Sequence, residues 1–221
     1  MALTRPRTLA EQAAVELQEA ILSGELAPGA PLRLEKLART LDMSPMPVRE
    51  AIRQLEMLGL AEYVPHRGAR VSELSIDDLR DTYEARLQLE TLAVRHAAER
   101  FTDREAERCE RLLAEHTRAY RNGDGRRGRE LHAEFHFTLY TASGSQWLPR
   151  LIRPLWENSE RYRLASLSVR GSLERRRREH QVILDACARR DPAAAEEALR
   201  AHLVLTANLV ARKMGEPPLF D

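Results

Sequence analysis

One run of the chain, residues 44–58, constrains the fold more than any other. It opens with Ser44 and two prolines, which are tolerated in the first turn of a helix, so we expect a helix that Ser44 caps. Apolar residues then recur at three- and four-residue steps and form one stripe: Val48, Ala51, Ile52, Leu55 and Leu58. Arg49 and Arg53, four residues apart, lie together on another face. This pattern predicts a short helix suited to the major groove of DNA.

The segments around this run complete a winged helix-turn-helix. Periodicity predicts helices at residues 8–22 and 34–41 and short strands at 61–64 and 69–71. Two short helices joined by a few residues are typical of a helix-turn-helix, and a hairpin that follows it is a wing. His66 and Arg67 lie at the expected tip of that wing, where they can reach a phosphate or a minor-groove edge.

From residue 75 onward the sequence predicts helices only. The expected spans are 76–100, 103–121, 126–143, 146–166, 172–190 and 192–213. The fold class is therefore mainly α. We expect a winged helix-turn-helix DNA-binding domain over residues 1–73 and an all-helical effector-binding and dimerisation domain over residues 74–221.

Composition excludes several function classes. The whole-chain net charge of +1 gives no argument for nucleic-acid binding. Residues 1–73 carry 9 Lys+Arg against 10 Asp+Glu, which counts against a non-specific DNA coat, although the local placement of arginines still permits a sequence reader. An aromatic content of 5% disfavours platforms that stack single-stranded bases. Without an apolar run of about 18 residues or a signal peptide, we expect a cytoplasmic protein that does not enter the membrane. Cys109 and Cys187 lack metal or redox spacing, and reduced thiols are expected.

Four histidines are placed as a metal site requires. His132 and His136 are four residues apart on one predicted helix, so their rings point the same way. His180 and His202 lie 11 residues before and after Asp191, the expected hinge between the last two helices. If these helices fold back on each other, the two rings are level. Imidazole suits zinc, nickel, copper and iron. The alternative is a set of hydrogen-bonded histidines on helix faces.

Arg86 interrupts an apolar stripe and stands four residues before Glu90. One interpretation is an intrahelical ion pair, which contributes about 0.3–0.5 kcal/mol when exposed. A guanidinium can also bind a carboxylate through a two-point fork. The sequence leaves both roles open.

Both halves of the chain resemble a known family. The first 72 residues are similar to the winged helix-turn-helix of GntR-type bacterial transcription regulators. The residues that carry this likeness are Gly24–Leu26, Pro28-Gly29, Leu37-Ala38, Ser44–Ile52, Leu55, Gly59-Leu60 and Pro65–Val71. The remainder resembles the FCD, or FadR-like, ligand-sensing domain, in its shorter six-helix form. The carrying residues there are Arg86, Glu90, Ala97-Ala98, Phe135-His136, Ala142-Ser143-Gly144, Glu179-His180, Arg190-Asp191 and His202.

The resemblance implies a metal held by one Asp and three His, and an arginine that lines the effector cavity. His132 takes the place of the Asp, so we expect a more nitrogen-rich site that favours zinc or nickel over manganese. Arg86 matches the arginine and implies a small organic acid as effector. A second departure is Pro45, where many relatives carry an arginine; no base contact is expected from it.

These observations predict an effector-responsive, sequence-specific transcription regulator, with repression as the expected mode. A homodimer would read a two-fold operator in double-stranded DNA. Arg49 and Arg53 are expected to contact guanine or phosphate, and Met46 and Pro47 to contact thymine methyls. Arg33, His66, Arg67 and Ser44 complete the expected DNA-binding set. The alternatives are a metal-dependent enzyme and a helical protein-interaction module; we expect no enzymatic activity.

Overall fold

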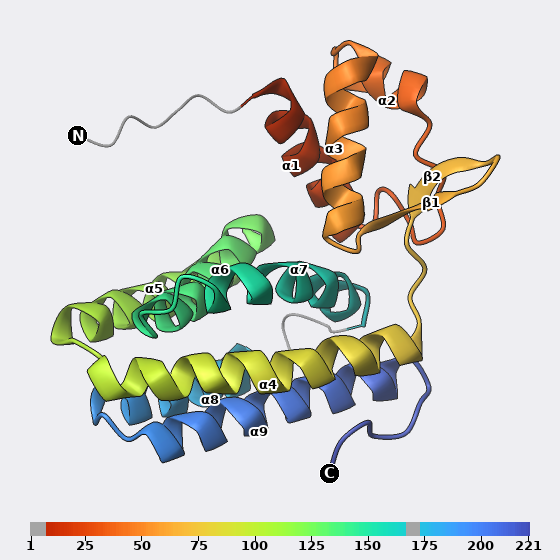
Figure 1. The fold of residues 1–221 in the computed structure, drawn as a ribbon. Coiled ribbons are helices and arrows are strands. Elements are labelled where there is room, and N and C mark those ends of the chain that lie inside the picture. The colour runs from red at the N-terminus through yellow and green to blue at the C-terminus, as the bar shows by residue number, and fades with distance from the viewer. Residues whose placement is uncertain (1–7, 167–172) are drawn as a thin grey trace. The chain divides into compact units, whose positions relative to one another are not determined.

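The computed structural model describes residues 8–166 and 173–221 (Figure 1). The chain separates into two compact units. Among the described residues, one unit comprises residues 8–78 together with 154–165, and the other comprises residues 79–153 together with 166 and 173–221. The domain boundary expected between residues 73 and 74 stays a prediction.

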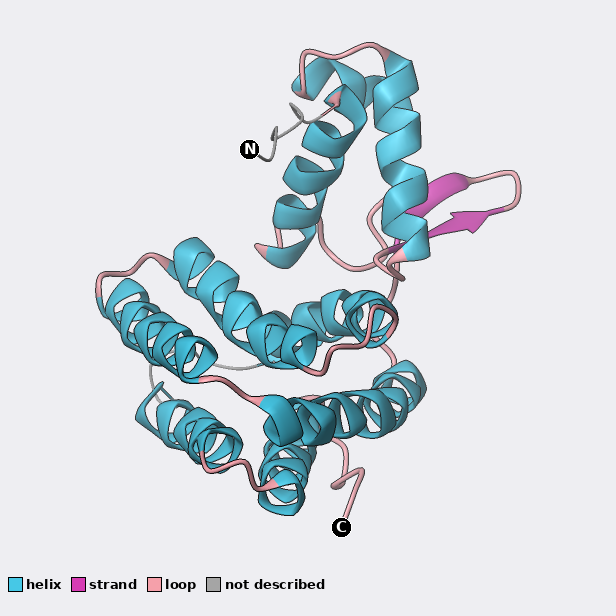
Figure 2. Ribbon diagram, turned by 60° about the vertical axis from the view of Figure 1, so that its left-hand side comes forward, coloured by secondary structure: helices cyan, strands magenta, loops and turns pink. Residues whose placement is uncertain are grey.

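The first unit contains a three-helix core with a β-hairpin (Figure 2). Its elements are α1 (Leu9–Leu22), α2 (Leu34–Thr40), α3 (Pro45–Met57), β1 (Ala61–Val64) and β2 (Gly68–Val71). The apolar stripe of α3 is buried against α1 and α2, as its periodicity predicted. The hairpin adds Leu60, Ala61 and Val71 to the same core, so α3 is held with its other face toward solvent.

Ser44 takes the position that precedes the helix, but its expected side-chain cap is wrong. The backbone of Ser44 is extended, and its hydroxyl makes no capping hydrogen bond. Pro47, the third helical residue, has no N–H to donate to that hydroxyl. The exposed side chain of Ser44 is therefore not engaged in capping its own helix.

The wing is a two-stranded antiparallel hairpin in which Ala61 pairs with Val71 and Val64 with Gly68. At its tip, the Arg67 amide donates to the Val64 carbonyl at 3.0 Å, and His66 has a left-handed φ of 63°. On the other side of β2, the Leu32 amide donates to the Ala69 carbonyl at 2.8 Å. The hairpin is thus tied to the segment before α2, and its exposed tip projects from the unit.

Arg161 ties the segment that follows the wing to the second half of α7 (Leu148–Ser166). Its guanidinium donates to the carbonyls of Ser72 and Glu73 at 2.7 and 3.1 Å, and to Asp78 at 3.1 Å. The Tyr162 hydroxyl also donates to Asp78. All these residues belong to the first unit, so α7 contributes directly to the fold that surrounds the wing.

Replacing Arg161 with alanine should therefore destabilise the first unit. Two backbone carbonyls lose a charged donor, and each such bond contributes about 1.5–3 kcal/mol. We expect a fall of about 3 kcal/mol in the free energy of unfolding, measured by urea denaturation. A glutamyl endopeptidase should also cut faster after the exposed Glu73. Arg53→Ala, which removes an exposed arginine from the same unit, is the control; equal stability and cleavage in both variants would contradict the role of Arg161.

The rest of the described chain is helical; it forms the second unit and also supplies residues 154–165 of the first. Following the wing, the described residues form α4 (Ile76–Arg100), α5 (Asp103–Arg121), α6 (Gly125–Ala142), α7, α8 (Leu173–Ala188) and α9 (Pro192–Lys213). These spans agree with the expected ones to within two residues where the structure describes them; residue 172, the expected start of one helix, lies outside. The mainly α fold class, with a winged helix-turn-helix and a helical remainder, is confirmed. Within the described part of the chain, no helix is long and apolar enough to span a membrane.

Local signals explain where these helices begin. Thr102 and Glu105 form the predicted reciprocal capping box before α5. Asp191 caps α9 by accepting from the Ala194 amide at 3.0 Å, immediately before a proline at the first helical position. Asp191 lies between α8 and α9, which pack along each other. Residues of the two helices that are equally far from Asp191 therefore lie side by side.

Both cysteines are buried in the helical unit as free thiols. Burial raises the pKa of Cys109 to about 12, with a smaller contribution from Cys187. Burial alone raises the pKa of Cys187 to about 12. Both thiols are thus protonated at neutral pH and therefore weak nucleophiles, and their free state agrees with the expected reduced thiols.

Candidate functional site

The four predicted DNA-binding arginines surround one hollow on the first unit. This hollow, of about 650 Å³, lies between the exposed face of α3 and the wing. Its lining includes Arg33, Arg49, Arg53 and Arg67. All four residues are exposed. Arg53 has a loose ion pair with the exposed Glu50 at 3.7 Å, which water and salt screen easily. The hollow therefore presents a concentration of positive charge.

The other predicted DNA-binding residues lie at the two ends of this surface. Ser44, Met46 and Pro47 form the start of α3, where Met46 is 77% exposed. His66 lies at the exposed hairpin tip. An exposed methionine at the front of a helix provides the apolar contact that a thymine methyl accepts. The structure thus leaves all eight predicted residues at least partly accessible to a partner.

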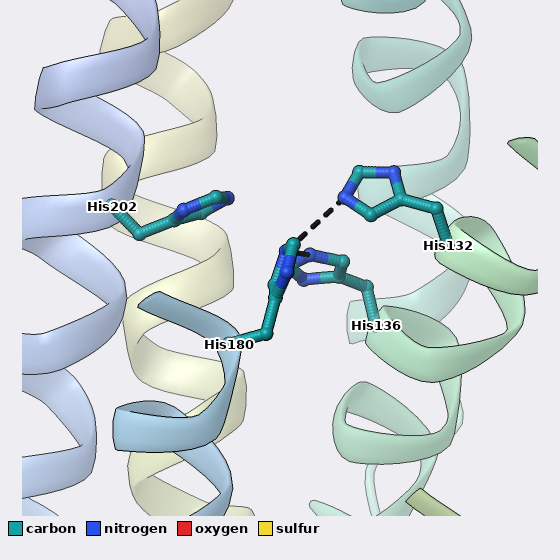
Figure 3. A group of neighbouring side chains, drawn as sticks. All are labelled: His132, His136, His180 and His202. Carbon is teal, nitrogen blue, oxygen red and sulfur yellow. Dashed lines mark hydrogen bonds between the residues drawn. The ribbon is translucent and has the colours of Figure 1, made fainter. Parts of the chain in front are cut away.

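The four predicted metal-binding histidines converge in the helical unit (Figure 3). His132 and His136 come from α6, His180 from α8 and His202 from α9. All four are buried, and one ligand atom of each lies within 4.8 Å of all the others. The His180 Nε2 contacts both histidines of α6: it lies 3.2 Å from the His132 Nε2 and 3.0 Å from the His136 Nε2. The rings of His180 and His202 are 4.7 Å apart, so the predicted level placement around Asp191 is confirmed.

The donor set and its spacing fit a divalent cation. Tetrahedral coordination with zinc–nitrogen bonds of about 2.0–2.1 Å separates neighbouring ligand nitrogens by roughly 3.3 Å. The nitrogens around His180 are already at 3.0 and 3.2 Å. Four neutral imidazoles suit zinc, nickel or copper better than the oxygen-preferring manganese or magnesium. The cluster could therefore hold a metal ion, as the histidine pattern predicted.

Two further residues support the rings from outside, and sequence reasoning missed both. The Glu179 carboxylate lies 2.8 Å from the His202 Nδ1; from the sequence, Glu179 was named only for its part in the family resemblance. The Tyr140 hydroxyl lies 3.1 Å from the His136 Nδ1. Tyr140 follows His136 by four residues, so helical spacing was a signal that could have found it.

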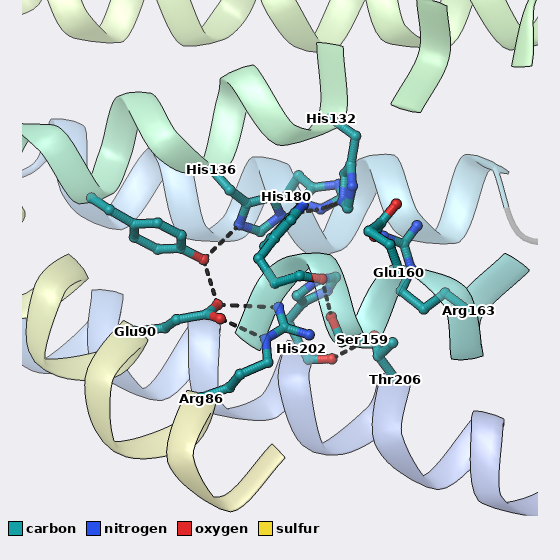
Figure 4. A network of polar contacts seen from close by, with 12 residues as sticks. Arg86, Glu90, His132, His136, Ser159, Glu160, Arg163, His180, His202 and Thr206 are labelled. Carbon is teal, nitrogen blue, oxygen red and sulfur yellow. Dashed lines mark hydrogen bonds and ion pairs between the residues drawn. The ribbon is translucent and has the colours of Figure 1, made fainter. Parts of the chain in front are cut away.

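Arg86 forms a buried ion pair with Glu90 rather than the weak exposed pair considered above. The Arg86 side chain is 4% exposed and that of Glu90 is 0% exposed. Arg86 Nε and Nη2 donate to the two oxygens of Glu90 at 2.6 and 3.3 Å (Figure 4). Burial lowers the pKa of Arg86, but the attraction of Glu90, with smaller contributions from two tyrosines, outweighs it and leaves that pKa above its ordinary value. The guanidinium is permanently charged.

Tyr140 connects this ion pair to the histidines. Its hydroxyl donates to Glu90 Oε2 at 2.5 Å while it contacts His136. Burial, and then the negative charge of Glu90, raise the pKa of Tyr140 well above 10. The phenol therefore keeps its proton at physiological pH, and Arg86, Glu90, Tyr140 and His136 form one continuous buried chain of polar contacts.

A solvent-facing helix with a wing, joined to a helical unit with a buried histidine cluster, defines a DNA-binding transcription regulator. Residues 9–71 match the domain described as "Bacterial regulatory proteins, gntR family", and residues 81–205 match the FCD domain. The chain belongs to the GntR family of transcription regulators and carries an FCD domain. Its membership of the shorter six-helix group stays a prediction.

The most informative relatives are regulators as well. The probable D-xylose utilization operon transcriptional repressor of Paenarthrobacter nicotinovorans is 32% identical over 213 residues, which cover 96% of this chain and 93% of that protein. The HTH-type regulator BphR of Paraburkholderia xenovorans (strain LB400) is 28% identical over 218 residues, or 95% and 87% of the two chains. The structure of E. coli McbR/YncC has the same fold, with a TM-score of 0.81, 24% identity and coverage of 95% and 100%. The chain is thus a regulator and not an enzyme.

Proposed function

We propose that the chain is a cytoplasmic, homodimeric repressor that reads a palindromic operator and responds to a small organic acid in its metal-containing helical domain. One observation carries this proposal: the same chain gathers four exposed arginines around one hollow and four buried histidines around one point. The first arrangement suits a polyanion, and the second suits a cation. A regulator that senses a metabolite needs both a site that binds DNA and a site that binds the metabolite.

In this proposal α3 enters the major groove. Arg49 and Arg53 contact guanine edges or phosphates, while Met46 and Pro47 face thymine methyls. The remaining predicted residues, Arg33, Ser44, His66 and Arg67, contact the sugar–phosphate backbone and set the register. The support is the exposure of these residues and the position of the hollow between α3 and the wing.

In the helical unit, His132, His136, His180 and His202 would hold zinc or nickel. The ion would supply a Lewis-acidic site for an effector carboxylate. Arg86 is the cationic residue that would bind the effector carboxylate, although its guanidinium is already paired with Glu90. An incoming carboxylate would therefore have to share or replace the contact with Glu90. This competition limits effector affinity and links effector binding to a rearrangement of the buried polar chain.

Repression as the mode of action is supported by the names of relatives. The D-xylose protein and GlaR of E. coli (strain K12), which is 28% identical over 220 residues, are both described as transcriptional repressors. We propose that this chain is also a repressor: the effector-free dimer binds the operator, and the effector lowers its affinity for the operator. A coupling of about 1–3 kcal/mol, or 5- to 150-fold in affinity, is typical of such linkage.

Selection from a random double-stranded DNA library tests this function with the purified protein. We expect enrichment of a short palindrome, bound by two chains, and about one equivalent of metal per chain. Adding a panel of small carboxylates should include compounds that weaken operator binding 5- to 150-fold, with matched neutral amides as controls. Enrichment without any common sequence would contradict the operator-reading function. A single bound chain would contradict the homodimer.

A further inference from the structure

In each hydrogen bond of the buried polar chain around His136, the donor and the acceptor can be assigned. An ionised carboxylate only accepts hydrogen bonds, so the Tyr140 hydroxyl donates its single proton to Glu90 Oε2. The phenol oxygen is then left to accept, and the atom 3.1 Å away is the His136 Nδ1. His136 must therefore carry its proton on Nδ1. Its Nε2, which faces His180 at 3.0 Å, keeps a lone pair.

The same reasoning applies independently to His202. Its Nδ1 lies 2.8 Å from the Glu179 Oε2, and the carboxylate again can only accept. The other oxygen of Glu179 lies 3.2 Å from the Arg175 Nε, which holds the carboxylate in place. The His202 Nδ1 therefore carries the proton, and its Nε2 keeps a lone pair for the centre of the cluster.

These two supports come from different helices and use different chemistry. Tyr140 is on the same helix as His136, but its carboxylate anchor, Glu90, comes from α4, 50 residues away. Glu179 reaches from α8 to His202 on α9. Arg86 completes the first support by holding Glu90 through two contacts. Figure 4 shows this path from Arg86 and Glu90 to His136.

We propose that Tyr140 and Glu179 are positioning residues that fix His136 and His202 in the Nδ1-protonated tautomer, so that both Nε2 lone pairs face the metal position. Arg86 and Glu90 anchor Tyr140 and so belong to the support of the metal centre. This inference rests on the proposed metal-binding function. Such outer partners orient a ligating imidazole and raise its basicity, and losing one lowers metal affinity 10- to 100-fold.

The first test needs no metal. Long-range ¹⁵N–¹H correlation spectra of the metal-free, labelled full-length protein report the tautomer of each histidine. We expect His136 and His202 to be protonated on Nδ1. Tyr140→Phe should shift His136 toward a mixture of tautomers and leave His202 unchanged, whereas Glu179→Ala should do the reverse. Glu179→Gln should restore His202, because the amide oxygen still accepts. His136 or His202 protonated on Nε2 in the wild type would overturn the proposal.

The second test measures zinc affinity by competition with a chromophoric chelator. Tyr140→Phe and Glu179→Ala should each weaken binding 10- to 100-fold. Tyr162→Phe, which removes a hydroxyl bonded to Asp78 in the first unit, should bind as the wild type does. Unchanged affinity in both variants would overturn the positioning role. A wild type that binds no metal yet shows the expected tautomers would refute the metal-binding function and leave the tautomer assignment standing, so the two failures are distinguishable.

Discussion

His180→Ala is expected to lose metal almost completely. The His180 Nε2 lies 3.2 Å from the His132 Nε2 and 3.0 Å from the His136 Nε2. Removing this side chain takes away the ligand nitrogen that contacts both α6 histidines and leaves only three imidazoles for the ion. We expect about one equivalent of zinc or nickel per wild-type chain after dialysis, and less than a tenth of that in the variant, measured by elemental analysis.

Thermal denaturation gives a second readout of the same change. Metal at a free concentration of about 100 times its dissociation constant stabilises a folded protein by about 2.7 kcal/mol. The wild type should gain this stability on addition of zinc, and His180→Ala should gain none. His96→Ala removes a histidine of α4 that lies outside the cluster and serves as the control. Full metal content and full stabilisation in His180→Ala would show that the four histidines do not hold the ion.

Arg49→Ala is expected to abolish specific operator binding without affecting assembly. A bidentate arginine–guanine contact contributes about 1–3 kcal/mol of discrimination. A dimer loses it twice, which corresponds to a fall of roughly 30- to 10⁴-fold in affinity for the selected palindrome. Fluorescence anisotropy at fixed salt measures this affinity, and analytical ultracentrifugation measures the oligomeric state.

The salt dependence separates the two roles considered for Arg49. If the side chain reads a base, the variant loses preference for one base pair while its weak, non-specific binding persists. If it contacts a phosphate, binding weakens on all sequences and the slope of log affinity against log salt falls by about 1 per contact. Arg111→Ala, which removes the same charge from the helical unit, controls for net charge. Undiminished specific binding by Arg49→Ala would contradict the position assigned to α3.

Local signals were sufficient for the helices and for much of the site. The capping box at Thr102 and the Asp191-Pro192 start act through neighbours in sequence, so the spans of α5 and α9 were predictable. Helical spacing also placed His132 and His136 on one face. Even the proximity of His180 and His202 followed from their equal separation from one turn.

Contacts between distant segments were not predictable in this way. Tyr140 and Glu90 are 50 residues apart, and their hydrogen bond depends on where the fold places α4 and α6 within the helical unit. The ion pair of Arg86 looks the same in sequence whether it is exposed or buried, yet burial changes both its strength and its partners. Ser44 shows the opposite case: a side-chain cap was predicted from its residue type, but Pro47 at the third helical position has no N–H to donate to it.

Periodicity, caps and turn residues in the chain itself determined which segments are helices, which faces are apolar and which residue types are available for DNA and metal. Those features depend on interactions over a few residues. The tertiary structure alone decided that Arg161 holds the segment after the wing, that Arg86 is buried and that Tyr140 and Glu179 support two imidazoles. These outcomes depend on the packing of helices far apart in sequence, and that packing sets the burial and direction of each polar group.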